Sequence, residues 1–430
     1  MKPALGIGIA GLGTVGGGVL KLLHDNAEYV ARRAGRRLEV RAVSARDRRK
    51  ERGVALNGAV WLDNARALAS QPGVDVVVEL IGGAEGVARD LAQATLDRGK
   101  PLVTANKALL ARHGTDLAMR AEKAGVALAC EAAVAGGIPI LKALREGLAG
   151  NRIESAVGIL NGTCNYILTE MQRTGRDFAE VLAEAQRLGY AEADPAFDVD
   201  GVDAAHKLAI LASIAFGFAV DFGAVHVEGI RSITAADIDY ARQLGYRIKL
   251  LAIAERTPHG IAQRVHPAMV PLRSPLAHVD GVFNAIVVEG DFVGRTVFEG
   301  RGAGAGPTAS AVVADLVDIA AGRVAPAFGV PIRWLDNQPK APIDRHRGTF
   351  YVRLQVVDRP GVLADIAAVL RDETISIESL LQRGRDPGEE VSVVMTTHET
   401  EEAAMGRALA RIAKLGAVTE APHRIRIVPN

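Results

Sequence analysis

The chain has 430 residues, which exceeds one ordinary domain and allows two or three domains with cores of their own. Its 51 Lys and Arg residues balance 50 Asp and Glu residues, so we expect small molecules or other subunits as partners, and neither nucleic acid nor a membrane. Two cysteines, no signal peptide and no apolar run of the ~18 residues that a membrane span needs predict a cytoplasmic protein without disulfides.

The first elements predict a nucleotide-binding domain. Residues 6–10 alternate glycine with apolar side chains, as in a short buried strand, and a helix is expected over 15–29. Between them the glycines have G-x-G-x-x-G spacing, in the segment Gly11, Leu12, Gly13, Thr14, Val15 and Gly16. Between a strand and a helix, this spacing favours dinucleotide binding over a plain tight turn, because the helix N-terminus offers free N–H groups to the phosphates.

The second predicted strand, 38–43, bears on the choice of cofactor. It lacks the acidic residue that would bind the ribose of NAD, and it continues into a basic segment, 44–50. Arg46 in that segment could hold a 2′-phosphate, so NADP(H) is the preferred cofactor and NAD(H) the alternative. A solvated basic loop is the competing interpretation.

Strands are predicted over 74–80, 101–104 and 127–131, with helices between them, as in a parallel sheet of Rossmann type. Ligands of such sheets lie beyond the carboxyl ends of the strands. This rule places five residues around the cofactor: Gly82, Gly83, Thr104, Asn106 and Lys107. Lys107 could alternatively just begin an exposed helix.

The pattern changes after residue 136. Strand-like runs at 153–160, 229–233, 249–255, 261–269 and 285–289, with a helix over 167–173, predict an α+β domain whose sheet could carry a subunit interface. The segment 300–308, which contains Gly304 and Gly306, precedes a helix expected from about 309 to 321. We expect it to return to the first domain and cover the nicotinamide side of the cofactor, unless it is a flexible connector.

An acidic loop lies between two predicted helices, 178–188 and 202–216. It gathers Glu192, Asp194, Asp198, Asp200 and Asp203. Asp203 and Lys207 are four residues apart and therefore share one helix face. The competing structural interpretation makes Asp200 the N-cap of the helix, with Asp203 completing a capping box; we expect Asp200 to begin the helix in either case.

The C-terminal region begins with a linker expected over 331–347, because this segment holds several prolines and charges without apolar periodicity. The order β-α-β-β-α-β from residue 348 onward predicts a ferredoxin-like module. Asp358 and Gly361, in its first strand–helix turn, either contact a ligand or only cap the following helix.

The acidic loop resembles the signature of homoserine dehydrogenases. The matching residues are Ala185, Gly189, Asp194, Pro195, Asp198, Gly201, Val202, Asp203 and Lys207. The resemblance covers residues 1–330, including the segments 104–107 and 161–163, whereas Cys164 replaces a threonine common in the family. The last domain is similar to an ACT domain.

The resemblance implies reversible reduction of L-aspartate 4-semialdehyde to L-homoserine by NAD(P)H, in threonine, methionine and isoleucine biosynthesis. It implies that Lys207 donates the proton, with Lys107 orienting the carbonyl. Substrate-binding positions are Glu192, Asp203, Lys107, Asn161, Gly162 and Thr163. A sodium site would comprise Glu131 and the carbonyls of Val134, Gly136 and Ile138. Threonine is the expected regulator, bound at Asp358 and Gly361, and the expected assembly is a homodimer or homotetramer.

The expected architecture is α/β with three domains. These are a Rossmann domain (1–135, completed by the helix after 306), an α+β catalytic and dimerisation domain (136–330) and, after the linker, an ACT domain (348–430). Two other functions compete with the family's reaction. A 2-hydroxy-acid dehydrogenase would need a histidine acid/base, but His206 points about 100° away from Lys207 on a helix. A non-catalytic sensor would have no need of the paired lysines.

Overall fold

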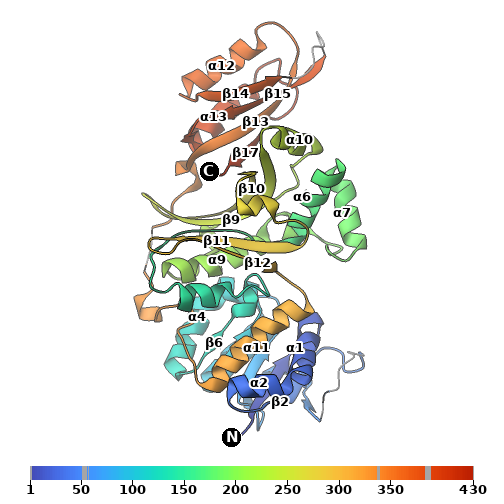
Figure 1. The fold of residues 1–430 in the computed structure, drawn as a ribbon, viewed down its shortest axis with the longest axis vertical. Helices are drawn as coiled ribbons and strands as arrows, with labels where there is room; N and C mark the ends of the chain where they lie inside the picture. Colours follow the sequence, from blue (N-terminus) through green and yellow to red (C-terminus); the bar gives the residue numbers. More distant parts are fainter. Residues whose placement is uncertain (1, 51–55, 57, 337–338, 383–388, 430) are drawn as a thin grey trace.

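The computed structural model describes residues 2–50, 56, 58–336, 339–382 and 389–429. The mixed α/β chain is elongated, with the N-terminal sheet at one end and the C-terminal module at the other (Figure 1). Within the described residues, no helix combines the length and apolarity required to cross a membrane.

The N-terminal sheet has six parallel strands in the order β3-β2-β1-β4-β5-β6, which is the Rossmann order. The strands are β1 (Leu5–Ala10), β2 (Leu38–Ser44), β3 (Val60–Trp61), β4 (Val76–Glu79), β5 (Leu102–Thr104) and β6 (Leu128–Ala129). All six residues of β1 are buried, as expected for a parallel strand covered by helices on both faces. The predicted nucleotide-binding fold is confirmed.

The helices of this domain are α1 (Thr14–Asp25), α2 (Ala27–Ala34), α3 (Val87–Asp97) and α4 (Lys107–Ala124). The prediction of one helix over 15–29 is wrong, because the backbone leaves helical geometry at Asn26 (φ −109°, ψ 19°). A much later helix, α11 (Ala305–Ala321), packs beside α1 (Figure 1). Gly18 permits this close approach, since a Cβ there would lie 2.4 Å from the carbonyl oxygen of Ala305.

The second sheet has eleven strands, nine of them in the order β12-β11-β7-β9-β10-β17-β13-β15-β14. Its first part contains β7 (Ile153–Ile159), β8 (His226–Val227), β9 (Tyr246–Thr257), β10 (Gly260–Pro271), β11 (Phe283–Gly290) and β12 (Gly294–Arg301). The helices of this part are α5 (Ile140–Lys142), α6 (Gly162–Thr174), α7 (Phe178–Arg187), α8 (Ala196–Val199), α9 (Val202–Phe216) and α10 (Ala235–Gln243). The predicted helix 202–216 is confirmed to the residue.

Two expectations for this region are wrong. Residues 229–233 form a turn after β8 instead of a strand, because the Ile230 N–H donates to the carbonyl of Val199 and not to a strand neighbour. The glycine-rich segment 300–308 is not one loop: β12 extends to Arg301, and α11 begins at Ala305. Much of β12 is exposed, so its sequence lacks the apolar alternation that would have revealed a strand.

The C-terminal module has the predicted β-α-β-β-α-β order. It contains β13 (Arg347–Val357), α12 (Val362–Asp372), β14 (Ile377–Gln382), β15 (Glu390–Thr397), β16 (Thr400–Glu401), α13 (Glu402–Ile412) and β17 (His423–Ile427). Its sheet is continuous with that of the preceding domain, because β17 pairs in parallel with β10 through Ala268 opposite Arg426 and Met269 opposite Ile427. Of the predicted linker, residues 337–338 lie outside the described residues, and the Ala341 N–H donates to the carbonyl of Ile261.

A buried carboxylate fastens the C-terminal module to α10. Asp237 is fully buried and accepts hydrogen bonds from the guanidinium of Arg353 at 2.7 Å and the hydroxyl of Tyr351 at 3.0 Å. Burial alone would raise the pKa of Asp237, but hydrogen bonds from His423 and Arg353 hold it well below its usual value. The carboxylate is therefore charged in the folded protein.

We predict that Asp237→Asn lowers the free energy of unfolding by about 3 kcal/mol at pH 7, because Arg353 loses its buried anionic partner. Since the folded-state pKa is depressed, the contribution of Asp237 is full above the unfolded pKa of about 4 and is lost as the pH falls further. The difference between the two proteins should therefore shrink at pH 3. Denaturant unfolding at both pH values measures it, and equal stabilities at pH 7 would contradict the prediction.

Candidate active site

A buried carboxylate connects lysines from two domains. Asp203, in the first turn of α9, pairs through Oδ2 with the Nζ of Lys207 at 2.7 Å and through Oδ1 with the Nζ of Lys107 at 2.5 Å. Lys207 is one turn further along α9, and Lys107 is the first residue of α4 in the N-terminal domain. Lys107 therefore begins a helix and also reaches the acidic residue predicted to bind substrate.

The charges in this cluster depend on one another. Burial would raise the pKa of Asp203, but the neighbouring Lys207 and Lys107 hold it well below its usual value. Burial lowers the pKa of Lys207 from its ordinary value, and the carboxylate of Asp203 opposes this effect. Lys207 is therefore an ammonium that releases its proton more readily than a solvated lysine.

Asn161 connects this cluster to the acidic loop. Its side-chain amide donates to Asp203 Oδ2 and to Asp198 Oδ1, both at 2.8 Å, while its Oδ1 accepts from the backbone N–H of Cys164. Asn161 is thus the N-cap of α6, which begins at Gly162 and not near residue 167 as predicted. The thiol of Cys164 donates to the carbonyl of Asp198 at 3.2 Å, so it supplies a donor where the family commonly has threonine.

The two residues after Asn161, Gly162 and Thr163, each contact the backbone of a neighbouring loop. A Cβ on Gly162 would lie 2.8 Å from the carbonyl oxygen of Val282, so the loop before β11 packs directly on this helix end. The hydroxyl of Thr163 donates to the carbonyl of Tyr190 at 2.8 Å and so anchors the start of the acidic loop.

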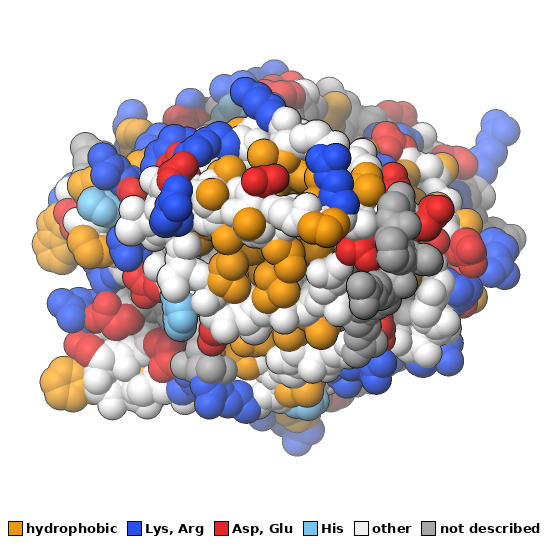
Figure 2. Space-filling model, turned by 90° about the horizontal axis from the view of Figure 1, so that it is seen from above, with side chains coloured by type: hydrophobic (Ala, Val, Ile, Leu, Met, Phe, Trp, Pro, Cys, Tyr) orange, Lys and Arg blue, Asp and Glu red, His pale blue; other side chains and the backbone are white. Residues whose placement is uncertain are grey.

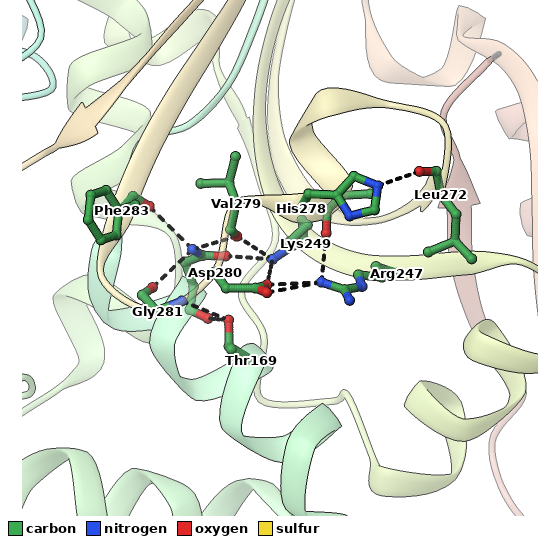
Figure 3. Close-up of polar contacts among 11 residues, drawn as sticks. Thr169, Arg247, Lys249, Leu272, His278, Val279, Asp280, Gly281 and Phe283 are labelled. Atoms are coloured by element: carbon green, nitrogen blue, oxygen red, sulfur yellow. Dashed lines mark hydrogen bonds and ion pairs between the residues drawn. The ribbon is translucent and has the colours of Figure 1, made fainter.

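A buried lysine connects α6 to the loop before β11 (Figure 3). Lys249, in β9, donates to Asn165 Oδ1 at 3.1 Å and to the carbonyl of Val279 at 2.5 Å. The amide of Asn165 donates to three carbonyls of the same loop, those of Val279, Gly281 and Phe283. The sequence analysis missed both residues; a lysine inside an otherwise apolar strand was the available signal.

Other parts of the acidic loop lie apart from the cluster. Glu192 is exposed, and the side chain of Gln186 holds its carbonyl at 3.0 Å; no described side-chain contact brings it to Asp203. The expectation that Asp200 begins α9 is wrong, because the N-cap is Gly201 in left-handed geometry (φ 84°), without a side-chain cap. Asp200 instead pairs with Arg231 at 2.5 Å. Asp203 consequently pairs with lysines and forms no capping box.

His206 is a packing residue in this structure. Its ring lies 4.4 Å from that of Phe222 and 5.5 Å from that of Phe197, between centroids. Burial lowers the pKa of His206 to about 4, so the imidazole is neutral at physiological pH.

The glycine-rich turn at the N-terminus of α1 leaves space for a pyrophosphate. A Cβ on Gly11 (φ 97°) would lie 2.4 Å from the carbonyl oxygen of Leu80, and one on Gly16 would lie 2.1 Å from that of Gly11. In contrast, a Cβ on Gly13 would have no atom within 4 Å, so the backbone there is open to a ligand. Leu12, Thr14 and Val15 complete the turn. Arg46 is exposed just beyond β2, whose last residue, Ser44, accepts the Gly11 N–H.

A carboxylate that the sequence analysis missed organises the carboxyl ends of β4 and β5. Glu79, at the end of β4, is fully buried; it accepts from the hydroxyl of Thr104 at 2.6 Å and from the Ile81 N–H at 2.7 Å. Asn106 caps α4, donates to the Gly83 carbonyl at 2.7 Å, and its backbone N–H donates to Thr104. Glu79 therefore fixes the segment that contains Gly82 and the helix that begins at Lys107. An acidic residue ending an apolar strand was the signal.

The N-terminus of α11 lies against the crossing between the domains. Gly304 (φ 119°) is its N-cap, and Gly306 lies in its open first turn. A Cβ on Gly136 would lie 2.4 Å from the carbonyl oxygen of Gly302, so the two glycine-rich segments are in backbone contact.

Glu131, the predicted sodium ligand, is buried at this crossing. Burial and the nearby Asp315 raise the pKa of Glu131 to about 7, and its carboxylate accepts the N–H groups of Leu141 and Lys142. The turn that follows has two residues of positive φ, Ala135 and Gly136. Of the other predicted carbonyl ligands, that of Ile138 accepts the Ile140 N–H. Val134 is the residue that ends the short helix over 131–133.

Three family models match the chain. They are "Homoserine dehydrogenase, NAD binding domain" at residues 11–131, "Homoserine dehydrogenase" at 139–317 and "ACT domain" at 350–417. Homoserine dehydrogenases of Pseudomonas aeruginosa and Neisseria gonorrhoeae are each 47% identical to it, over 99% of this chain and 99% of the relative.

Solved structures give the same result. A homoserine dehydrogenase from Thiobacillus denitrificans has a TM-score of 0.94 at 48% identity and covers 100% of this chain and 99% of its own. A hyperthermophilic archaeal homoserine dehydrogenase in complex with NADPH has a TM-score of 0.63 at 25% identity and covers 74% of this chain and 97% of its own. With relatives this similar over the whole length, the chain belongs to the homoserine dehydrogenase family.

Proposed function

We propose that this homoserine dehydrogenase reduces L-aspartate 4-semialdehyde to L-homoserine, reversibly, at the cluster of Lys107, Asp203 and Lys207. The observation that carries the proposal is the ion pairing of Asp203 with both lysines, one of which begins a helix of the cofactor-binding domain. The hydride must therefore pass from the cofactor to the aldehyde carbon where these two domains meet.

The bound reduced nicotinamide supplies a hydride to the aldehyde carbon. As negative charge develops on the aldehyde oxygen, Lys207 stabilises it and donates a proton, for which its lowered pKa is suited. Lys107, a third exposed, orients the carbonyl from the cofactor side. Asp203 holds both lysines as ammonium groups and, with Glu192 and the turn 161–163, binds the substrate's own ammonium group.

The competing functions fit this geometry less well. A histidine acid/base for a 2-hydroxy acid would have to titrate near neutral pH and face the lysines, whereas His206 is neutral and packed between two phenylalanine rings. A sensor without turnover would give no reason to bury a lysine that releases its proton readily.

We predict that Lys207→Met lowers kcat for NADPH-dependent reduction at least ~10²-fold, because the alkoxide loses its proton donor. In the wild-type enzyme, reduction should decline with rising pH along a limb below the ordinary lysine value of 10.5, since only protonated Lys207 is competent. Steady-state assays across pH measure both effects. Lys100→Met removes another desolvated lysine, which precedes β5 at the end of that strand opposite to Thr104 and donates to the Gln71 carbonyl, and should retain activity. A Lys207 variant of wild-type rate would contradict the proposal.

We propose NADP(H) as the preferred cofactor, with Arg46 contacting the 2′-phosphate. Its support is the exposed position of Arg46 at the end of β2, beside the glycine-rich turn, and the NADPH bound by the archaeal relative. The cofactor would be held by the turn 11–16, by Gly82, Gly83, Thr104 and Asn106, and by Gly304 and Gly306.

Arg46→Ala should raise KM for NADPH roughly tenfold and leave KM for NADH nearly unchanged, because only NADPH carries the 2′-phosphate. Arg41→Ala is the matched control, since Arg41 is a nearby arginine within β2 and pairs with Glu39 at 2.5 Å. An unchanged ratio of the two KM values in the Arg46 variant would refute the assignment.

A sodium ion is proposed at Glu131 and the carbonyls of Val134, Gly136 and Ile138. The buried carboxylate beside Asp315 supports it, because a cation would relieve the cost of burying that charge. Among the described residues no group of three or more His, Cys, Asp or Glu side chains is placed to hold a metal ion. The proposed ligand set accordingly has one carboxylate and three carbonyl oxygens.

A homodimer or homotetramer is proposed as the assembly. The hairpin between β11 and β12 supports it: Phe292 at its tip is 91% exposed, and Val297 on the edge strand β12 is 44% exposed. A cytoplasmic location remains a prediction, as does the division into functional units at 1–135, 136–330 and 348–430.

Regulation by threonine is proposed at the ACT domain. A pocket of about 410 Å³ lies at the turn between β13 and α12 and is lined by Asp358, Gly361 and Gln382. Gly361 has a φ of 96°, which shapes this turn. Figure 2 shows apolar side chains gathered in the middle of this end of the molecule, and Leu363, which lines the pocket, is 38% exposed.

We predict that Asp358→Ala raises the threonine concentration for half-inhibition at least about tenfold, because the pocket loses the carboxylate that would bind the amino group. Asp365→Ala changes an exposed carboxylate in the first turn of the same helix and should not shift it. Each variant is compared with its own rate without threonine. The full chain is used, because removing the ACT domain would also remove β17 from β10. An unshifted half-inhibition in Asp358→Ala would exclude this pocket.

A further inference from the structure

Arg426, in the last strand of the chain, is buried between two carboxylates. Its Nη1 and Nη2 donate to Glu228 of the catalytic domain, both at 2.8 Å. Its Nε and Nη2 donate to Glu402, the first residue of α13 in the ACT domain, at 2.9 and 2.7 Å. Only 3% of Arg426 is exposed. One guanidinium therefore makes two bidentate ion pairs, one with each domain.

The residue after Glu228, Gly229, makes a close backbone contact with the acidic loop. A Cβ on Gly229 would lie 2.3 Å from the carbonyl oxygen of Val199 and 2.6 Å from the Cα of Asp200. The next residue, Ile230, donates its N–H to the carbonyl of Val199 at 2.8 Å. A Cβ on Gly201, at the other end of this segment, would lie 3.3 Å from the carbonyl oxygen of Glu228. The segment after Glu228 thus supports residues 199–201 through backbone atoms.

Residues 199–201 connect the two carboxylates that share Asn161. Asp198 precedes this segment and Asp203 follows it, and the Asn161 amide donates to both at 2.8 Å. Val199 is fully buried, and the left-handed Gly201 sets the entry angle of α9. A shift of 199–201 would therefore change the separation of Asp198 from Asp203 and the alignment of Asp203 with its lysines.

We propose that Arg426 is a positioning residue for the substrate side of the active site, which makes the final strand of the ACT domain part of the catalytic scaffold. The inference rests on the proposed substrate-binding role of Asp203 and Asn161. Without Arg426, Glu402 would keep its ion pair with Arg424 at 2.7 Å and Glu228 its contact with His226 at 2.8 Å, but the cation that joins the two carboxylates would be lost. Their repulsion would then displace Glu228 and the backbone that follows it. The parallel pairing of β10 with β17 has only two residue pairs in register and offers little resistance.

The cofactor side should be unaffected. The strand order has β17 between β10 and β13, in the second sheet, whereas the glycine-rich turn belongs to the six-stranded N-terminal sheet. Loss of Arg426 should therefore separate the two substrates kinetically, which a general loss of stability would not do.

The test is steady-state kinetics of the full chain without threonine, for Arg426→Met and the matched control Arg353→Met. Both variants remove an ACT-domain arginine that pairs with a catalytic-domain carboxylate, but Arg353 is partly buried and pairs with Asp237 on α10. We expect Arg426→Met to raise KM for aspartate semialdehyde about tenfold or more, with KM for NADPH within about twofold of wild type. Arg353→Met should lower the melting temperature while keeping both KM values within about twofold.

Two further variants complete the design. Arg426→Lys keeps the charge but loses the bidentate geometry, so its KM for aspartate semialdehyde should lie between those of wild type and Arg426→Met. Glu228→Gln keeps the shape of the side chain and serves if Arg426→Met does not fold; it removes the bidentate ion pair that fixes Glu228 to Arg426, so it should raise the same KM. A wild-type KM for aspartate semialdehyde in Arg426→Met or, failing that, in Glu228→Gln overturns the inference, and so does an equal increase in Arg353→Met. Absence of wild-type turnover would instead defeat the proposed function.

Discussion

The burial of Asp203 between two lysines is the interaction on which the active site depends. A carboxylate without solvent is costly unless cations and hydrogen bonds surround it, and here Lys107, Lys207 and Asn161 supply them. Because Lys107 belongs to the cofactor-binding domain, the same ion pairs that stabilise the carboxylate also join that domain to α9. One set of contacts therefore both stabilises the buried carboxylate and sets the relative position of α4 and α9.

Buried polar side chains beneath the site keep this cluster in place. Lys249 and Asn165 hold the loop under α6, and Glu79 holds the segment before α4. Each satisfies several backbone groups in an apolar environment, where an unpaired polar atom would be expensive. None of them reaches the lysines, yet each determines where a helix that carries a site residue begins.

The ACT domain is joined to the catalytic domain more closely than a module on a linker would be. The second sheet passes from one domain into the other through β10 and β17, and two arginines, the partly buried Arg353 and the buried Arg426, pair with carboxylates across the boundary. The path from the ACT domain to the segment before Asp203 is therefore short. It consists of the ion pair of Arg426 with Glu228 and the backbone contact of the next residue, Gly229, with residues 199 and 200.

Short-range patterns determined much of this protein from the sequence. The glycine spacing after β1, the helix 202–216 and the i, i+4 pair of Asp203 and Lys207 follow from periodicity and local backbone geometry, and all three are present in the structure. The β-α-β-β-α-β order of the C-terminal module is likewise local. The acidic loop also had enough residues at fixed spacing to reveal the family.

Only the tertiary structure decided which distant residues meet. Lys107 and Asp203 are ninety-six positions apart, Arg426 and Glu228 are 198 apart, and α11 (Ala305–Ala321) returns to α1 (Thr14–Asp25). At Asp200 the local rule failed, because a nearby arginine, Arg231, took its carboxylate and a left-handed glycine began the helix instead. Local capping propensity is worth about 1 kcal/mol at such a position, and the half-exposed ion pair of Asp200 is worth no more than that. The close backbone contact of Gly229 with residues 199 and 200, which no local pattern reveals, therefore decides the conformation.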